Sequence, residues 1–334
     1  MSINLSSLNT KPRLLFEIPL APIQGQRFQP TGFPGLGAAT FQTSKGQCLL
    51  VESAQSMANR LELTVWDEVN QDVKKELIGL SHVKVIRKGE FLTDTILEAH
   101  RINSPYILAG KDKTFIDQLK VELGGLEEGP IDRRKLTETL LKFDVGALLH
   151  GVFLAKKELA GGRFKLSRTL SAFIEADGVR VAASGGVKND HVNPQGEAKS
   201  GFGNVPYARD EFTADKVTLY VNLDLSQIRG YGLGAEVEKL LFLLALYKVR
   251  ALVEGNLRLR TACDFKLATD AVNASSPQGF ALPALAELVA ELTSAIKSCA
   301  GKMKVTEVTF DDELKKGKDD KEAEADDNED QSEG

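Results

Sequence analysis

Hydrogen-bonding side chains gather in the stretch VESAQSMANRLE, residues 51–62, directly after the apolar run 48–51. The change of pattern predicts a strand over 47–51 and a helix from Ser53, whose side chain can cap the first turn. Such a helix start offers free N–H groups and the positive end of the helix dipole, which together suit a phosphate. By spacing, the first three of the next four polar side chains share one side of the helix. These four are Gln55, Ser56, Asn59 and Arg60.

Two arginines alternate with leucines in LRLR, residues 257–260, within a predicted strand over 255–265. Because side chains two apart in a strand point to the same side, Arg258 and Arg260 share one face of the sheet. A guanidinium binds phosphate oxygens through paired N–H donors, so this face suits a phosphate backbone. The alternative interpretation is an ordinary solvated strand face.

Two longer segments mix cations, aromatic rings and glycines. Residues 24–46 form a Gly/Pro/Gln-rich stretch without periodicity, and loops of that length are often functional. Residues 184–209 indicate an extended mobile loop or finger, because they offer little material for a core. Cations follow a nucleic-acid backbone and rings meet bases, so both segments suit single-stranded RNA. The candidate contacts are Arg27, Gln29 and Phe33 in the first segment, and Lys188, His191, Lys199, Phe202 and Arg209 in the second.

One glycine-rich motif indicates a different function. GYGLGA, residues 230–235, matches the G-x-G-x-x-A fingerprint of dinucleotide-binding proteins, and Arg229 lies beside it. The preceding half of the chain lacks the alternation of strands and helices that a Rossmann domain requires. The alternative is a turn in which the glycines allow the backbone to approach closely.

The sequence offers little for catalysis. The four histidines are scattered, and the apolar run around His150 predicts a satisfied core histidine. Neither a nucleophile elbow nor a P-loop motif occurs, so we expect no enzyme activity, no metal site and no cofactor. The aspartates on predicted elements are isolated from one another: Asp94, Asp224 and Asp264.

The charge of the chain is divided unevenly. The 334 residues carry a net charge of −5, yet residues 311–334 alone hold 12 acidic and 4 basic residues, a net charge of −8. The rest of the chain is therefore slightly basic at +3, which permits an anionic partner. The acidic tail lacks aromatic residues and cannot bury enough apolar surface to fold, so we predict that it is disordered.

Cysteine usage and hydropathy indicate a cytoplasmic protein. The three cysteines are widely spaced and form no CxxC pair, which disfavours a disulfide framework or a structural zinc site. The N-terminus lacks the basic region and apolar core of a signal peptide. The longest apolar run, Leu240–Leu246, is far too short to span a bilayer, so we expect no membrane association.

Periodicity and turn signals predict the elements that must position these residues. The dipeptide Asp177-Gly178 between two alternating runs predicts a type I′ hairpin that joins 170–176 to 179–183. The last half of the chain reads strand, helix, strand, helix, strand, which favours an α+β fold with a ferredoxin-like or RRM-like core and large insertions. The main predicted strands are 13–20, 47–51, 82–87, 217–225, 255–265 and 303–310, and the main helices are 114–123, 133–143, 235–249 and 282–299.

Six segments, in chain order, resemble one protein family. They are VESAQSMANRLE, ILEAHRINSPYI, LLHGVFLA, SAFIEADGVRV, YVNLDLSQIRGYGLG and LRLRTACD. Residues 53–60 are similar to the strand-then-helix S-x-Q-S-x-x-x-R segment of the CRISPR-associated RAMP backbone subunits, which polymerise along guide RNA in Cascade-type complexes. The chain as a whole looks like the type I-G (formerly I-U) version of that subunit, over roughly residues 12–310.

The resemblance implies a fold of the α+β class, an RRM-like (ferredoxin-like) RAMP palm with inserted helical or finger segments and a thumb-like β-hairpin. Residues 1–310 would then be a single domain, followed by the acidic tail 311–334. The insertions would fall at about 65–160, which is helical or finger-like, and about 170–210, which holds the hairpin and mobile finger.

The resemblance also implies a function. The protein would be a non-catalytic subunit that oligomerises along crRNA in a CRISPR surveillance complex, for target DNA recognition and antiviral defence. Its partners would be crRNA, target DNA through the guide, further copies of itself and other Cascade subunits. Residues 184–209 would supply the thumb or a neighbour contact. The guide backbone would be contacted by Ser53, Gln55, Ser56, Asn59 and Arg60. Two alternatives stay open: a metal-dependent endoribonuclease of the same superfamily, and a nucleotide-binding protein that uses Gly230–Ala235.

Overall fold

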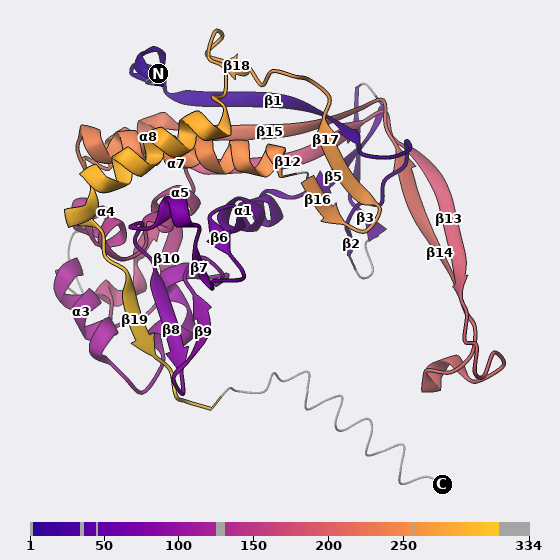
Figure 1. Ribbon diagram of the computed structural model, residues 1–334, viewed down its shortest axis with the longest axis horizontal. Coiled ribbons are helices and arrows are strands. Elements are labelled where there is room, and N and C mark those ends of the chain that lie inside the picture. The colour runs from indigo at the N-terminus through magenta and orange to yellow at the C-terminus, as the bar shows by residue number, and fades with distance from the viewer. Residues whose placement is uncertain (1–2, 34–36, 45, 125–130, 256, 314–334) are drawn as a thin grey trace.

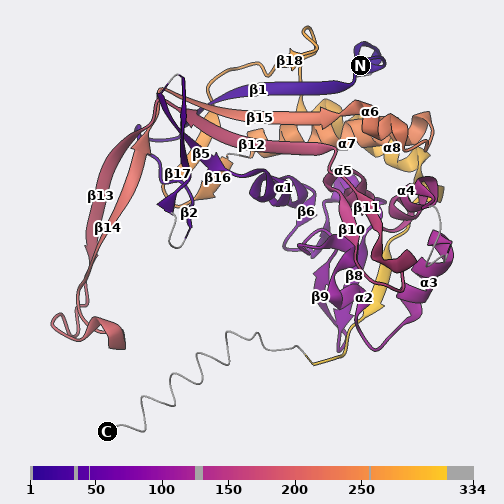
Figure 2. The same ribbon diagram turned by 180° about the vertical axis from the view of Figure 1, so that it is seen from behind.

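The structure is a computed structural model, and it describes residues 3–33, 37–44, 46–124, 131–255 and 257–313. The predicted disorder of the tail therefore concerns residues that lie almost entirely outside the described ranges. The fold is mixed α+β, as predicted. It consists of a body built on one antiparallel sheet, an insertion with its own small sheet, and a hairpin that projects away from both (Figures 1 and 2).

The main sheet of the body has eight strands in the order β16-β17-β1-β15-β12-β5-β4, with β18 also paired to β1. Neighbouring strands are antiparallel throughout. Buried and half-buried residues alternate along β1 and β12, so only one face of the sheet forms the core. The strands are β1 (Arg13–Pro22), β4 (Thr40–Thr43), β5 (Gly46–Glu52), β12 (Leu170–Asp177), β15 (Lys216–Asp224), β16 (Leu257–Arg260), β17 (Cys263–Leu267) and β18 (Ala274–Ser276).

Helices cover the buried face of this sheet (Figure 1). The central one is α7, in which most side chains are buried because it packs against both the sheet and α8. The positive φ of 89° at Gly234 lets the chain turn into α7. The helices of the body are α1 (Ala54–Leu63), α6 (Leu225–Gly230), α7 (Ala235–Glu254) and α8 (Leu285–Ser298).

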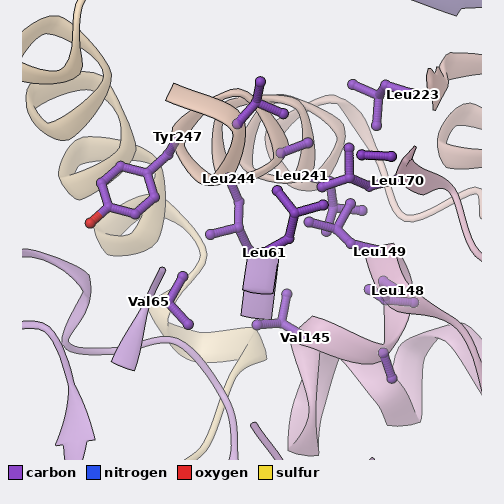
Figure 3. Packing of buried hydrophobic residues seen from close by; sticks show 14 of the residues in the cluster. Leu61, Val65, Val145, Leu148, Leu149, Leu170, Leu223, Leu241, Leu244 and Tyr247 are labelled. Atoms are coloured by element: carbon purple, nitrogen blue, oxygen red, sulfur yellow. The ribbon is translucent and has the colours of Figure 1, made fainter. Parts of the chain in front are cut away.

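The apolar core runs without a break from the body into the insertion. Figure 3 shows Leu61 of α1 between Leu241 and Leu244 of α7 and Val145 of the insertion helix α5 (Val145–His150), and all four are buried. Body and insertion therefore share one core and form one packed unit.

The insertion comprises residues 65–166 and is completed by the last described strand of the chain, β19 (Thr306–Thr309). Its sheet has the order β19-β8-β9, and β19 lies parallel to β8. We predicted a closing strand over 303–310, and it forms, but it joins this second sheet rather than the main one. The other elements include β6 (Trp66–Asp67), β7 (Asp72–Val73), β8 (Val83–Arg87), β9 (Glu90–Asp94), β10 (Val152–Leu154), β11 (Phe164–Leu166), α2 (Pro105–Leu108), α3 (Thr114–Leu123) and α4 (Arg133–Phe143).

The hairpin consists of β13 (Arg180–Lys188) and β14 (Val205–Thr213) and carries residues 189–204 at its tip. The prediction that Asp177-Gly178 closes a turn was wrong. Gly178 has the expected positive φ of 61°, yet the chain runs on from β12 into β13 and returns through β14 into β15. The Asp215 N–H donates to the Asp177 carbonyl at 3.0 Å, and the Val179 N–H donates to the Gln47 carbonyl at 3.0 Å. Gly178 therefore bends a long ribbon instead of reversing it.

The segment 255–265, predicted as one strand, is two antiparallel strands, β16 and β17. The reversal falls at Thr261-Ala262, where Ala262 adopts a positive φ of 58°. No glycine or proline marks this turn in the sequence, which is why periodicity alone missed it.

Candidate nucleic-acid interface

The polar stretch at residues 53–60 follows the end of β5 and forms the start of α1, as predicted. Ser53 is the N-cap residue, and its hydroxyl accepts a hydrogen bond from the Ser56 N–H at 3.3 Å. Gln55 and Asn59 lie on the exposed side of α1, where the Gln55 amide donates to the Asn59 side-chain oxygen at 3.4 Å. Uncharged amides therefore line the outer side of this helix start.

An arginine that no sequence motif marked lies beside the same helix start. Arg168, just before β12, donates to the Gln55 side-chain oxygen at 2.9 Å and to the Ala54 carbonyl at 3.0 Å. Burial, followed by the nearby Arg101, lowers the pKa of Arg168, but a guanidinium stays charged at neutral pH. Arg168 thus adds a cation beside the exposed amides of Gln55 and Asn59. The contact joins residues far apart in the sequence, so spacing along the chain cannot reveal it.

Three of the predicted contact residues converge on a buried carboxylate instead of pointing outward together. The side chain of Glu52 is only 1% exposed, and it accepts hydrogen bonds from Ser56, Arg260 and Arg60, the last at 2.9 Å. Ser56 therefore does not share the outer side of the helix with Gln55 and Asn59. Arg60 also donates to the carbonyls of Arg258 at 3.1 Å and Leu259 at 2.6 Å. This group, which we call the Glu52 cluster, ties α1 to β16.

A second buried carboxylate holds two further predicted arginines at the root of the hairpin. Glu211 of β14 is 3.5 Å from Arg27 and 2.8 Å from Arg209, measured between carboxylate oxygen and guanidinium nitrogen. Arg27 remains more than half exposed, whereas Arg209 is largely covered. The contact between Arg27 and Glu211 fixes the loop after β1 to the hairpin.

An open groove of about 700 Å³ lies between that loop, the hairpin root and the β16–β17 turn. Arg27 and Arg258 line it with two exposed cations, and Gln24 and Gln26 add amides. The Arg258 side chain is 75% exposed, and its nearest carboxylate, Asp264, is 3.7 Å away. Arg258 and Arg260, predicted on one face, thus differ: Arg258 faces the groove and Arg260 is committed to Glu52. We call this the hairpin-root groove.

The remaining predicted residues of the long loop are placed by backbone contacts. The Gln29 N–H donates to the Ala262 carbonyl at 2.7 Å, and its own carbonyl accepts from Arg260 at 3.4 Å. Phe33 lies on β2 (Gly32–Phe33), which pairs with β3 (Gly37–Ala38), and its side chain is outside the described part of the structure.

The predicted residues of the finger other than Arg209 occupy the far end of the hairpin. Lys188 ends β13, His191, Lys199 and Phe202 lie in the tip, and the Phe202 ring is 54% exposed. Figures 1 and 2 show the tip well away from the body. The structure therefore separates these side chains from the hairpin-root groove.

Arg229 is not part of this grouping. It lies on α6 at the opposite end of the main sheet, where it donates to the carbonyls of Leu8 and Lys11. The adjacent GYGLGA motif is also misplaced for a dinucleotide site, because helix α6 separates it from the strand β15. The fingerprint needs its first glycine directly after the strand, so the motif lacks the structural context of a dinucleotide-binding fingerprint. The glycines instead connect α6 to α7.

A buried charged cluster joins the insertion to the body. Arg101 forms two 2.6 Å hydrogen bonds to Glu62 of α1, and Asp144 and Lys248 lie around the same small cavity. Burial raises the pKa of Asp144 to about 6 and lowers that of Lys248 to about 8. This arrangement is enclosed, so it has a structural role at the junction.

Local partners hold His82 and two of the predicted aspartates. His82 and Asp94 are 2.6 Å apart inside the insertion, and Asp224 caps α6. His150 is buried, as predicted, but neither ring nitrogen has a partner among the described residues, so the prediction that it is satisfied was wrong. Burial holds its pKa well below the usual value and keeps the ring neutral. Within the described ranges, no group of three or more His, Cys, Asp or Glu side chains could hold a metal ion.

No helix that the structure describes combines the length and apolarity needed to cross a membrane.

The fold and the site together define the class of the molecule. It is an α+β protein with a curled antiparallel sheet and an exposed polar edge at the root of a long hairpin.

Comparison with known proteins gives the family. The family model of the CRISPR-associated protein GSU0053 matches residues 14–181, half of the chain, and the chain belongs to this family. The matched residues include α1, Arg27 and Arg168. A solved structure described as "CRISPR RNA-guided surveillance complex, pre-nicking" is similar at 15% identity, with a TM-score of 0.39 over 78% of this chain and 76% of that one. At that score we rest no inference on the likeness. No curated protein matches the sequence.

Proposed function

We propose that this CRISPR-associated protein is a non-catalytic, guide-RNA-binding backbone subunit of a type I-G surveillance complex, in which copies assemble along crRNA. The observation that carries the proposal is a pair of groupings of amides and cations, one at the start of α1 and one in the hairpin-root groove. Gln55, Asn59 and Arg168 lie at the start of α1, and Arg27 and Arg258 line the hairpin-root groove. The Glu52 cluster links the two places.

The strand order supports the further proposal that the body is an RRM-like palm. Strands β17, β1, β15 and β12 are adjacent in that order and antiparallel. Helix α1 falls between β1 and β12 in the chain, and α7 falls between β15 and β17. Two such split β-α-β halves are the plan of the ferredoxin-like fold.

The hairpin suits the role of a thumb. It leaves the body beside the hairpin-root groove and carries Phe202 and nearby cations at its tip. In our proposal the tip reaches the RNA or a neighbouring copy, while the groove holds the RNA backbone of its own copy.

The chemistry of the interface favours binding that ignores base sequence. A guide must be held whatever its sequence, so contacts should go to phosphate, sugar and base faces. Amides and helix N–H groups bind phosphate without a large excess of charge. Carboxylates beside most of the arginines limit that charge further, which reduces repulsion between copies that share one RNA.

The test is to mix the purified protein with single-stranded RNAs of increasing length in the presence of Mg²⁺. We expect stoichiometry and nuclease protection to grow in steps with RNA length, and the RNA to stay intact. Cleavage that is lost on an Asp→Ala change would replace the proposal with the endoribonuclease alternative. A single copy bound at every length would contradict the backbone role.

A further inference from the structure

A basic groove lies at the end of the molecule opposite the hairpin, between α4 and the segment that follows α8 (Figure 1). Its volume is about 780 Å³. Two carboxylates in its lining are already paired, Glu138 with Arg134 and Glu122 with Lys142. Five cations line it: Arg134, Lys135, Lys142, Lys302 and Lys304. The groove is therefore cationic and far from the proposed RNA interface.

A second groove, of about 530 Å³, continues from the first. It runs between helix α3 and the outer edge of β19, and Lys304 belongs to both linings. Within the described residues β19 pairs only with β8, so the backbone groups of its other edge are open to an extended chain. Its charged lining includes Asp112 and Glu307. We call it the edge groove.

The acidic tail begins where the edge groove ends. Asp311 accepts a hydrogen bond from the Lys88 N–H at 2.7 Å. Asp312 accepts from Arg87 at 3.2 Å and from the Lys111 N–H at 3.4 Å. These contacts fix the start of the tail beside Thr309, one of the residues lining the edge groove.

The charge order of the tail matches the order of the two grooves. Lys315, Lys316 and Lys318 come first, and residues 319–334 then hold nine acidic residues and one lysine. A chain folding back from residue 313 meets the acidic Asp112 and Glu307 first and the basic groove second. Five extended residues span about 17 Å, which is about the extended length of the chain from Thr309 back to Lys304, the residue that lines both grooves.

We propose that the tail folds back within its own chain, with residues 314–318 along the edge groove and residues 319–334 in the basic groove. A short tether gives the tail an effective concentration on the order of millimolar, so weak individual ion pairs suffice. The occupied groove is closed to other polyanions. The acidic segment thus keeps nucleic acid away from the face that lies opposite the interface.

The test is zero-length carbodiimide cross-linking of the full chain without RNA, at low and at high salt. We expect amide links between carboxylates of residues 319–334 and lysines of the basic groove, and their loss at high salt, where charges are screened. An equal mixture of ¹⁴N- and ¹⁵N-labelled protein should give cross-linked peptides of one label only.

Charge-reversal variants make the test specific. Lys302→Glu with Lys304→Glu should abolish links from the tail to the remaining groove lysines, Lys135 and Lys142. The control, Lys157→Glu with Lys266→Glu, changes two exposed lysines outside both grooves and should leave those links intact. Links spread evenly over exposed lysines, or links of mixed label, would overturn the proposal. The experiment contains no RNA, so its result is independent of the proposed function.

Discussion

The Nε atom of Arg60 lies 2.9 Å from a carboxylate oxygen of Glu52, whose side chain is almost wholly buried. Arg260 approaches the other oxygen of the same carboxylate. A buried carboxylate costs free energy to desolvate unless cations and hydrogen bonds compensate it. Arg60 and Arg260, which the sequence suggested for phosphate binding, thus stabilise the fold, and they do so at the centre of the proposed interface.

Replacing Glu52 should destabilise the protein. Glu52→Gln leaves two arginines without their shared counter-charge, and the free energy of unfolding should fall by about 2–3 kcal/mol, less than for a fully enclosed pair because each arginine is about a quarter exposed. The midpoint of urea unfolding measures this change. Glu68→Gln, at an exposed position, is the matched control. Equal midpoints for the two variants would mean that the Glu52 cluster contributes little.

Arg258 and Arg27 should matter more for RNA binding than for stability. Because both are exposed in the hairpin-root groove, their change to alanine should weaken binding of unrelated RNA sequences alike. The slope of log affinity against log salt should become shallower by about 0.7 for each phosphate that the variant no longer neutralises. Salt titrations followed by fluorescence anisotropy measure both quantities. For Arg258→Ala the free energy of unfolding should change by less than about 0.5 kcal/mol.

Arg229→Ala is the control for that experiment, since it removes the same charge from the opposite end of the sheet. Its RNA affinity and salt slope should equal those of the unchanged protein. If Arg229→Ala weakens binding as much as Arg258→Ala does, the assignment of the groove is wrong even where the family role holds.

The hairpin tip should be needed for assembly and dispensable for folding. Lys188 and Val205 are opposite each other in the hairpin, so residues 189–204 can be replaced by Asn-Gly, which suits a two-residue type I′ turn. We expect an unchanged melting temperature, and loss of the multimers that form on long RNA, measured by light scattering. Normal multimers would remove the tip from the proposed contact.

Asp144 should impose a pH dependence on stability. Its pKa is raised by burial from 3.8 to about 6, so the folded protein retains a proton that the unfolded chain has lost. The contribution of Asp144 to the free energy of unfolding is fully present below about pH 4 and is lost as the pH rises through 6. The difference in unfolding free energy between the unchanged protein and Asp144→Asn should fall by about 2–3 kcal/mol from pH 4 to pH 7. Asp117→Asn, on the exposed side of α3, should give no such trend.

Local signals predicted much of the fold. The helices at 114–123 and 133–143 were located from period alone, because their apolar stripes are regular. The N-cap role of Ser53 followed in the same way. These helices and this cap depend on residues close together in the sequence, so a sequence pattern can predict them.

Features set by distant contacts could not be predicted. The Asp177-Gly178 signal was real, but the return strand that pairs with β12 comes from residues 216–224. Arg168 meets Gln55 across a sequence separation of 113 residues, and the inward turn of Ser56 depends on the burial of Glu52. Tertiary packing decides which polar side chains face water. It left some of the predicted contact residues exposed and bound others to buried carboxylates.

The pairing of β19 with β8 has a consequence for synthesis on the ribosome. Residues 83–86 must wait for residues 306–309 before their sheet is complete, and contacts between such distant segments form late in folding. The exposed edge of β8 is therefore a place where a nascent chain is prone to wrong pairings. The sheet of newly made protein is complete only when residues 306–309 have emerged.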